Sequence, residues 1–246
     1  MNRTQTSTFP CFVALAFSIL YVLAGHPVQA QHLTYREWQE LSFRDMRLMP
    51  EYGHRPKNAE MMASDSSFVA QTLAAIPDPQ KASEHLVDLG FGLLREGDLT
   101  RAMYRFNQGY LVDPKNPSIF RGYGAFFLAL DRNAEAAQEY QKGLALDSLN
   151  GALMTDMAGV FLAEYHTIRT DDPEKAEQLL NGASGLAKRA LDLDATNAEA
   201  AFKLSVCHFR HANCKEAWTY FQQSVTLGSP SADEAYRKEL QGACPQ

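Results

Sequence analysis

A spacing of 34 residues repeats along this chain and restricts the fold more than any other feature of the sequence. In a unit starting at residue 83, fixed offsets hold the small or apolar residues Leu86, Leu89, Gly90, Leu93, Ala102 and Phe106. Units starting at residues 117 and 198 hold, at the same offsets, Phe120, Tyr123, Gly124, Phe127, Ala136 and Tyr140, and Ala201, Leu204, Ser205, His208, Ala217 and Phe221. Such a period is typical of a solenoid whose repeats pack only against their neighbours.

The small residues in each unit indicate two antiparallel helices in close contact. Gly90 and Ala102 lack bulk, so two helix backbones can approach while larger residues fill the space beside them. Gly97 favours a turn between the helices, and Asn116 followed by Pro117 is a typical helix start. Because one hairpin leaves an apolar face uncovered, several hairpins must stack.

In order and spacing, these residues resemble the tetratricopeptide repeat, with leucines replacing the aromatic residues in the first helix of the first unit. The resemblance implies an all-α fold, a right-handed superhelix of four helical hairpins. We predict these hairpins at residues 83–116, 117–150, 151–197 and 198–231. An arm and a helix precede them at residues 31–82, and a C-terminal capping helix follows at residues 232–246.

The third unit is longer than the others. Residues 151–197 span 47 positions, which is 13 more than the period of 34. We predict that the additional residues, around 164–182, form a longer loop and an extended second helix that Asp172 caps and Pro173 begins.

The N-terminus has the pattern of a secretory signal. Arg3 precedes an apolar run at residues 12–25, and the small residues Val28 and Ala30 are placed for cleavage before Gln31. We therefore predict that residues 1–30 are a signal peptide and that the mature protein is periplasmic or secreted. The run is shorter than the roughly 20 residues of a membrane-spanning helix, so we expect no transmembrane helix after cleavage.

Charge and motifs exclude several classes of function. The formal net charge is -6, and loss of Arg3 with the signal would make it -7, whereas a nucleic-acid partner needs a basic face. The sequence has no nucleophile elbow, phosphate-binding loop, zinc-protease helix or haem-attachment motif. We predict no catalytic residue, no cofactor and no metal.

The resemblance also implies a binding surface, because tetratricopeptide superhelices usually bind extended peptides along a concave face formed by the first helix of each hairpin. The residues expected to point to this face are Phe91, Leu94, Arg95, Arg121, Leu128, Thr155, Phe202, Phe209 and Arg210. We predict an exported, non-catalytic scaffold that binds a protein or peptide there.

The chain carries its own candidate occupant of that face. The arm at residues 31–57 is aromatic and could lie across it, with residues 50–57 extended. Internal occupancy by the arm and binding of an external partner both stay open. In a third interpretation, the repeats only support the arm and the arm is the effector.

Three cysteines follow the signal, and they allow at most one intramolecular disulfide. We favour Cys207 with Cys214 across the turn, which leaves Cys244 free; Cys214 with Cys244 is the alternative. Together with His208 and His211, the first two cysteines also offer side chains that bind zinc. The alternative function is therefore a metal-dependent or accessory enzyme subunit built around this cluster.

Overall fold

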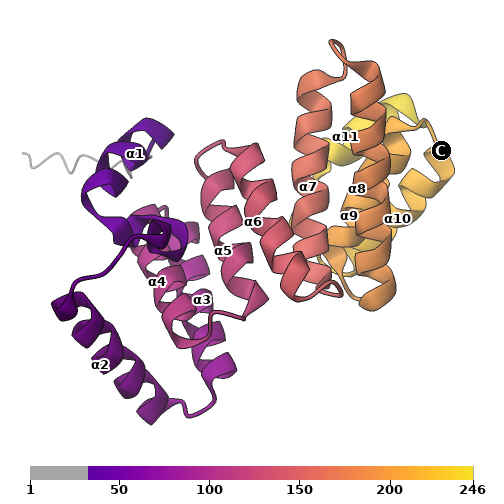
Figure 1. The fold of residues 1–246 in the computed structure, drawn as a ribbon. Coiled ribbons are helices and arrows are strands. Elements are labelled where there is room, and N and C mark those ends of the chain that lie inside the picture. Colours follow the sequence, from indigo (N-terminus) through magenta and orange to yellow (C-terminus); the bar gives the residue numbers. More distant parts are fainter. Residues whose placement is uncertain (1–32, 246) are drawn as a thin grey trace, which may run out of the picture. The chain divides into compact units, whose positions relative to one another are not determined.

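The computed structural model describes residues 33–245, which form eleven α-helices, two short 3-10 helices and no strand (Figure 1). The prediction of an all-α fold is confirmed. The predicted signal peptide at residues 1–30 lies outside the described residues. No helix within the described range is both long and apolar enough to cross a membrane.

Four helical hairpins follow one another along the chain. They are α3 (Pro79–Arg95) with α4 (Leu99–Val112), α5 (Pro117–Leu128) with α6 (Asn133–Leu146), α7 (Gly151–Ile168) with α8 (Pro173–Leu193), and α9 (Ala198–Arg210) with α10 (Cys214–Thr226). Neighbouring hairpins pack through α4 and α5, through α6 and α7, and through α8 and α9. Each hairpin therefore covers the apolar side of the next.

Further elements lie at both ends of the stack. The arm contains α1 (Tyr35–Arg44) and the 3-10 helices η1 (Met46–Leu48) and η2 (Pro50–His54), and α2 (Ala59–Ala75) links it to the first hairpin. The helix α11 (Glu234–Ala243) follows the last hairpin and packs against α9 through Tyr236, which contacts Phe202 and Phe209.

Short polar side chains start many of the helices, as the sequence indicates. Asp78, Asn116, Asn150 and Asp172 each accept a hydrogen bond from a backbone N–H of the following turn. These caps satisfy amide groups that have no partner within the helix, so they fix where each helix begins. The predicted starts at Asn116 and at Asp172 are confirmed.

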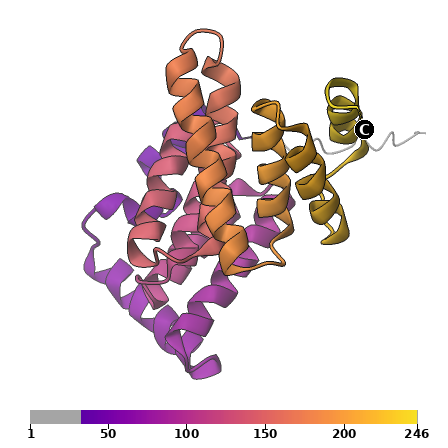
Figure 2. The ribbon, with the colours of Figure 1, turned by 90° about the vertical axis from the view of Figure 1, so that its right-hand side faces the viewer.

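The third hairpin is longer in its helices and not in its loop. α7 has 18 residues and α8 has 21, whereas α5 has 12 and α6 has 14. Only residues 169–172 connect α7 to α8, whose tips extend past the neighbouring helices (Figure 2). The prediction of a longer loop was wrong, because each residue added to an existing helix gains a backbone hydrogen bond. The extended second helix is confirmed.

Glycine contacts hold the two helices of a hairpin together. A Cβ atom added at Gly90 of α3 would overlap the ring of Phe106 on α4, and one added at Gly124 of α5 would overlap the ring of Tyr140 on α6. Both rings and Ala102 are fully or almost fully buried. The close helix contact expected from the repeat is therefore present, and an aromatic ring fills the space that each glycine leaves.

Gly90→Ala should lower the free energy of unfolding by about 1–3 kcal/mol, because the added methyl group overpacks against a buried ring. Gly185→Ala in α8 is the matched control, since nothing lies within 4 Å of its Cβ position. There, removal of a mid-helix glycine should stabilise the protein by about 0.5–1 kcal/mol. Urea unfolding followed by circular dichroism measures both changes, and equal effects would show that Gly90 has room for a side chain.

Candidate partner-binding site

The arm is attached to the stack through a buried polar network centred on Asn107 of α4. Its side-chain Nδ2 donates to the carbonyl oxygens of Arg47 and Met49, at 2.7 and 2.8 Å. Tyr123 Oη donates to Asn107 Oδ1 at 2.6 Å and accepts the backbone N–H of Glu51 at 3.2 Å. Asn107 and Tyr123 are fully buried, so these hydrogen bonds fix the arm against α4 and α5.

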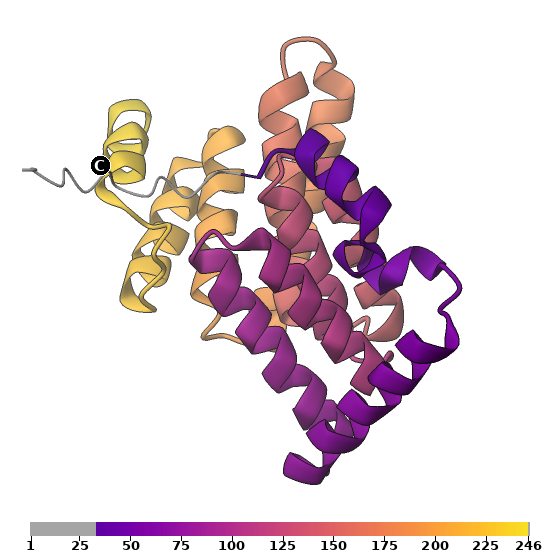
Figure 3. The ribbon, with the colours of Figure 1, turned by 90° about the vertical axis from the view of Figure 1, so that its left-hand side faces the viewer.

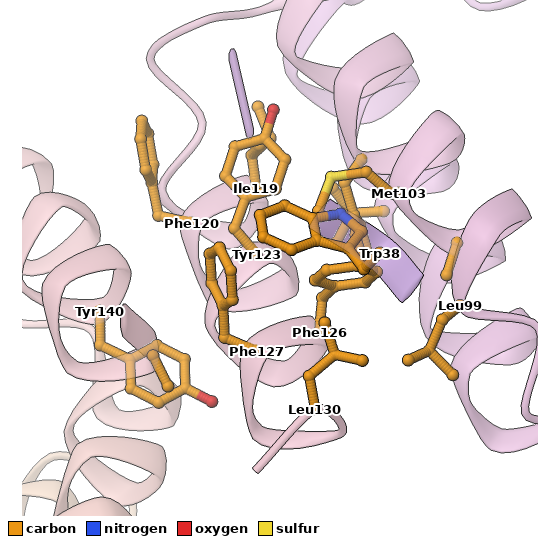
Figure 4. Packing of buried hydrophobic residues seen from close by; sticks show 14 of the residues in the cluster. Trp38, Leu99, Met103, Ile119, Phe120, Tyr123, Phe126, Phe127, Leu130 and Tyr140 are labelled. Atoms are coloured by element: carbon orange, nitrogen blue, oxygen red, sulfur yellow. The ribbon is translucent and has the colours of Figure 1, made fainter. Parts of the chain in front are cut away.

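Trp38 provides the apolar part of the same attachment. Its ring lies edge-on to Phe126 and Phe127, with centroid distances of 5.9 and 5.4 Å (Figure 4). The indole Nε1 donates to the carbonyl oxygen of Leu48 at 2.8 Å, so the ring is buried without an unpaired donor. Trp38 thereby joins the arm to the main hydrophobic core.

Charged groups at the arm add further contacts. Asp45 accepts from the Tyr104 hydroxyl at 2.8 Å, and its ion pair with Arg47 lowers the pKa of the Asp45 carboxyl to about 2. Lys142 of α6 lies 2.7 Å from a carboxylate oxygen of Glu51 and 3.0 Å from one of Glu139. Burial raises the pKa of Glu139.

The segment after Pro50 forms a left-handed turn. Glu51, Tyr52, Gly53 and His54 have φ angles of 53°, 58°, 61° and 52°, so the expectation of an extended segment was wrong for residues 50–54, whereas Arg55 is extended. The left-handed region is costly for residues other than glycine. Two contacts of Glu51 and the burial of Tyr52 hold the turn in place. The Glu51 backbone N–H donates to the Tyr123 hydroxyl, and the Glu51 carboxylate accepts from Lys142.

The arm contacts the side of the first two hairpins that is opposite to the predicted binding face. It meets α5 through residues 123, 126 and 127. At 100° per residue, these positions are about half a turn away from Arg121 and Leu128 on the same helix. Its other partners are on the second helices α4 and α6. The described arm does not occupy the predicted face, so the hypothesis of internal occupancy was wrong.

We call the exposed side of α3, α5 and α7 the first-helix face. Across it, the Arg121 guanidinium lies 4.9 Å from the centroid of Phe91 on α3, and its Nε lies 2.7 Å from a carboxylate oxygen of Asp156 on α7. Leu94, Leu128 and Phe91 are half-buried, and Arg95 is exposed. The structure thus brings together five of the predicted residues, on α3 and α5, as an apolar strip bordered by guanidinium groups.

The remaining predicted residues are engaged within the protein. Thr155 is buried, donates to the Gly151 carbonyl at 2.7 Å and accepts from Asn197 at 3.0 Å. Phe202 and Phe209 contact Tyr236 of α11, and Arg210 pairs with Glu239 of the same helix at 2.9 Å. The C-terminal helix therefore covers much of the surface that α9 would contribute.

The cysteines pair differently from our preferred prediction. Cys214 forms a disulfide with Cys244, and Cys207 is free and buried, so pairing Cys207 with Cys214 was wrong. The packing of α11 explains the result, because Trp218 donates to the carbonyl oxygen of Cys244 at 2.8 Å and holds it beside α10. Burial raises the pKa of the Cys207 thiol to about 12.

The four side chains of the alternative zinc-binding cluster each have other partners or a buried position. His208 stacks on Tyr220 with a centroid distance of 5.3 Å, and His211 lies 3.1 Å from Glu177. Cys214 is in the disulfide, and Cys207 lies in the core. Among the described residues, no group of side chains is arranged to hold a metal ion.

Sequence reasoning missed the Asn107 network. One period later the equivalent position is Gln141, which is exposed, so the repeat pattern does not mark residue 107. The only signal is an asparagine, a weak helix former, in the interior of a helix.

Asn107→Leu should lower the free energy of unfolding by about 1–3 kcal/mol, because two arm carbonyl oxygens and the Tyr123 hydroxyl lose their partner inside the protein. The arm should also become sensitive to limited proteolysis between residues 41 and 57. Asn181→Leu, at an exposed position of α8, is the control and should change neither. An arm that stays protected in Asn107→Leu would show that the apolar contacts of Trp38 suffice.

Of Cys207, Cys214 and Cys244, none should react rapidly with a thiol reagent in the native, unreduced protein, because two are bonded and one is a buried thiol of raised pKa. Unfolding without reductant should expose one thiol, which peptide mapping should assign to Cys207. Labelling at Cys244 instead would restore the pairing across the turn.

Comparisons with known proteins place the fold. No protein-family model matches the sequence, and neither does any curated protein. Among solved structures, TTC0263, a thermophilic TPR protein of Thermus thermophilus, is 17% identical over 66% of this chain and 83% of its own, with a TM-score of 0.57. A monomeric mutant of IFIT1 with Gppp-AAAA is 15% identical over 84% of this chain, with a TM-score of 0.56. The match covers 50% of IFIT1, so this chain spans about half of its length.

Proposed function

We propose, on the premise that this chain has the tetratricopeptide-repeat fold, that it is a non-catalytic scaffold that binds an extended segment of a partner protein along its first-helix face. The observation that carries the proposal is the position of the arm. The aromatic side chains of the arm are used on the opposite side of α5, so the arm does not cover the half-buried apolar residues Phe91, Leu94 and Leu128 of the first-helix face. Apolar surface of this kind is typical of an interaction site.

The side chains on this face favour a particular chemistry in the partner. Phe91, Leu94 and Leu128 provide apolar contacts, whereas Arg121 is already paired with Asp156. Arg95 is exposed and has no ion pair within residues 33–245, so it is available to a carboxylate. A segment with apolar residues and a nearby acidic group fits this arrangement.

A nucleic-acid ligand fits less well. IFIT1, whose structure includes Gppp-AAAA, shares the fold with this chain at 15% identity. The formal charge of -6 gives this chain no general attraction for phosphates. A shared fold alone does not carry a ligand from one protein to another.

We also propose that the protein is exported and acts in the periplasm or outside the cell. The pattern at residues 1–30 supports a cleaved signal. A disulfide between Cys214 and Cys244 fits an oxidising compartment, where such bonds persist.

If export involves cleavage before Gln31, protein recovered from its own host should have a mass that corresponds to a chain starting there. A retained N-terminal methionine and an uncleaved mass would contradict the proposal of a cleaved signal. The measurement is independent of any partner, so its failure would leave the binding proposal intact.

A photoreactive amino acid introduced at Leu94 or Leu128 should crosslink to the same partner in the native cell, because both positions lie on the first-helix face. The control carries the photoreactive group at Leu193, an exposed leucine of α8. Mass spectrometry of the adducts should identify one partner segment at the first two positions, and Arg95→Glu should reduce its yield. Adducts of equal yield at Leu193, or none at the other two positions, would refute the proposal.

A further inference from the structure

At the N-terminal end of the stack, a surface that packs against a helix in the other hairpins is only partly covered. At the seventh offset of the repeat, Tyr123, Met157 and Leu204 are 0%, 4% and 1% exposed, because each lies against the preceding hairpin. Leu89 occupies the same offset in the first hairpin and is 41% exposed. Within the described residues, no hairpin precedes it.

The helix α2 covers only part of this surface. Phe68 and Leu73, with their neighbours on α2, pack on Ala82 and Leu86 near the start of α3. Figure 3 shows α2 crossing beside the first hairpin. Beyond the contacts that α2 makes, the helices α3 and α4 enclose an open crease of about 700 Å³, and no residue of α2 lines it. Leu89 and Leu93 lie in this crease, at positions where the later hairpins are covered by a helix.

At the C-terminal end of the stack, the terminal helix α11 covers the last hairpin. The exposed side chains of α11 include the polar and charged Glu234, Arg237, Lys238 and Gln241. Three of them line a smaller opening of about 450 Å³ against α10, in which Val225 is exposed. A polar outer face is what a terminal element of a repeat array needs in order to stay monomeric at that end. The N-terminal end differs because its opening is larger and holds two leucines, the exposed Leu89 and the half-buried Leu93, which no helix covers within the described residues.

A glycine in the crease indicates close approach of another helix. Only Arg95 lies within 4 Å of the Cβ position of Gly92, at 3.9 Å. In contrast, a side chain lies within 3.4 Å of that position at every other mid-helix glycine of α3 to α7: Gly90, Gly109, Gly122, Gly124, Gly143 and Gly159. Gly92 lies between Leu89 and Leu93 on one helix face, and a small residue there lets a crossing helix come close.

The charges around the leucines suit a surface that binds itself. Four charged residues line the crease and have no ion pair within residues 33–245: Asp88 and Arg95 on α3, Glu96 directly after α3, and Arg105 on α4. Arg105 donates a hydrogen bond to Gln108. In a two-fold dimer, each surface meets a copy of itself, so the acids of one copy can face the guanidinium groups of the other.

We propose that the protein forms a two-fold homodimer through the outer face of its first hairpin, with the α3 helices of two copies crossing near Gly92. Apart from Arg95, which borders both surfaces, the first-helix residues Phe91, Leu94, Arg121 and Leu128 do not line the crease, so the dimer would present two copies of the proposed peptide-binding surface. The inference does not depend on that binding, because it rests on the crease alone.

Sedimentation equilibrium of the protein, purified as its host processes it, tests the proposal. The wild-type protein should be dimeric in the micromolar range, and Leu89→Glu should raise the dimer dissociation constant at least about tenfold by placing a carboxylate in the apolar centre. Leu193→Glu changes a comparably exposed leucine, 46% against 41%, and should leave the dimer intact. Circular dichroism should show unchanged helix content in both variants.

A charge exchange tests the partner directly. The double variant Asp88→Arg with Glu96→Arg and the double variant Arg95→Glu with Arg105→Glu should each be monomeric alone and should form a mixed dimer when combined. Variants that stay monomeric when mixed would overturn the proposed charge pairing.

A wild-type dimer that is unaffected by Leu89→Glu would overturn the proposed location of the dimer interface. A monomeric wild-type protein would overturn the proposal itself and leave the crease to a helix of a different protein.

Discussion

The close contact between the two helices of each hairpin is the constraint on which the rest of the structure depends. In the first two hairpins this contact places a glycine opposite a large ring, as Gly90 faces Phe106 and Gly124 faces Tyr140. Because the rings are buried at these contacts, the hairpin has one fixed geometry, and its remaining apolar side must be covered by the next hairpin. The stack, its two faces and its two ends all follow from this arrangement.

The arm shows how a segment outside the repeats becomes part of such a stack. Its attachment combines an apolar anchor, Trp38, with a buried polar centre, Asn107. A buried amide is costly unless each of its groups is paired, and here the carbonyl oxygens of Arg47 and Met49 and the hydroxyl of Tyr123 pair with it. The consequence for function is indirect, since an arm bound on one side leaves the other side open.

The two ends of the stack are covered to different extents. At the C-terminal end, α11 places Tyr236 against α9, and the disulfide between Cys214 and Cys244 ties the end of α11 to the last hairpin. At the N-terminal end, α2 covers the first hairpin at Ala82 and Leu86 and, within the described residues, leaves Leu89 and Leu93 without a covering helix. A repeat array needs its ends covered by polar surface or by another chain. The contrast between the ends is therefore the structural basis for expecting an assembly at only one of them.

The sequence by itself determined the helical class, the hairpins and several helix starts, because these depend on local spacing and on caps within a few residues of one another. The offsets of Gly90 and Ala102, the cap at Asn116 and the start at Pro173 are of this kind. Only the tertiary structure decided which face the arm uses, which cysteine pairs with Cys214, and that the longer third unit extends its helices. These outcomes depend on contacts between residues far apart in the chain, such as Asn107 with Met49 or Trp218 with Cys244, which no local period encodes.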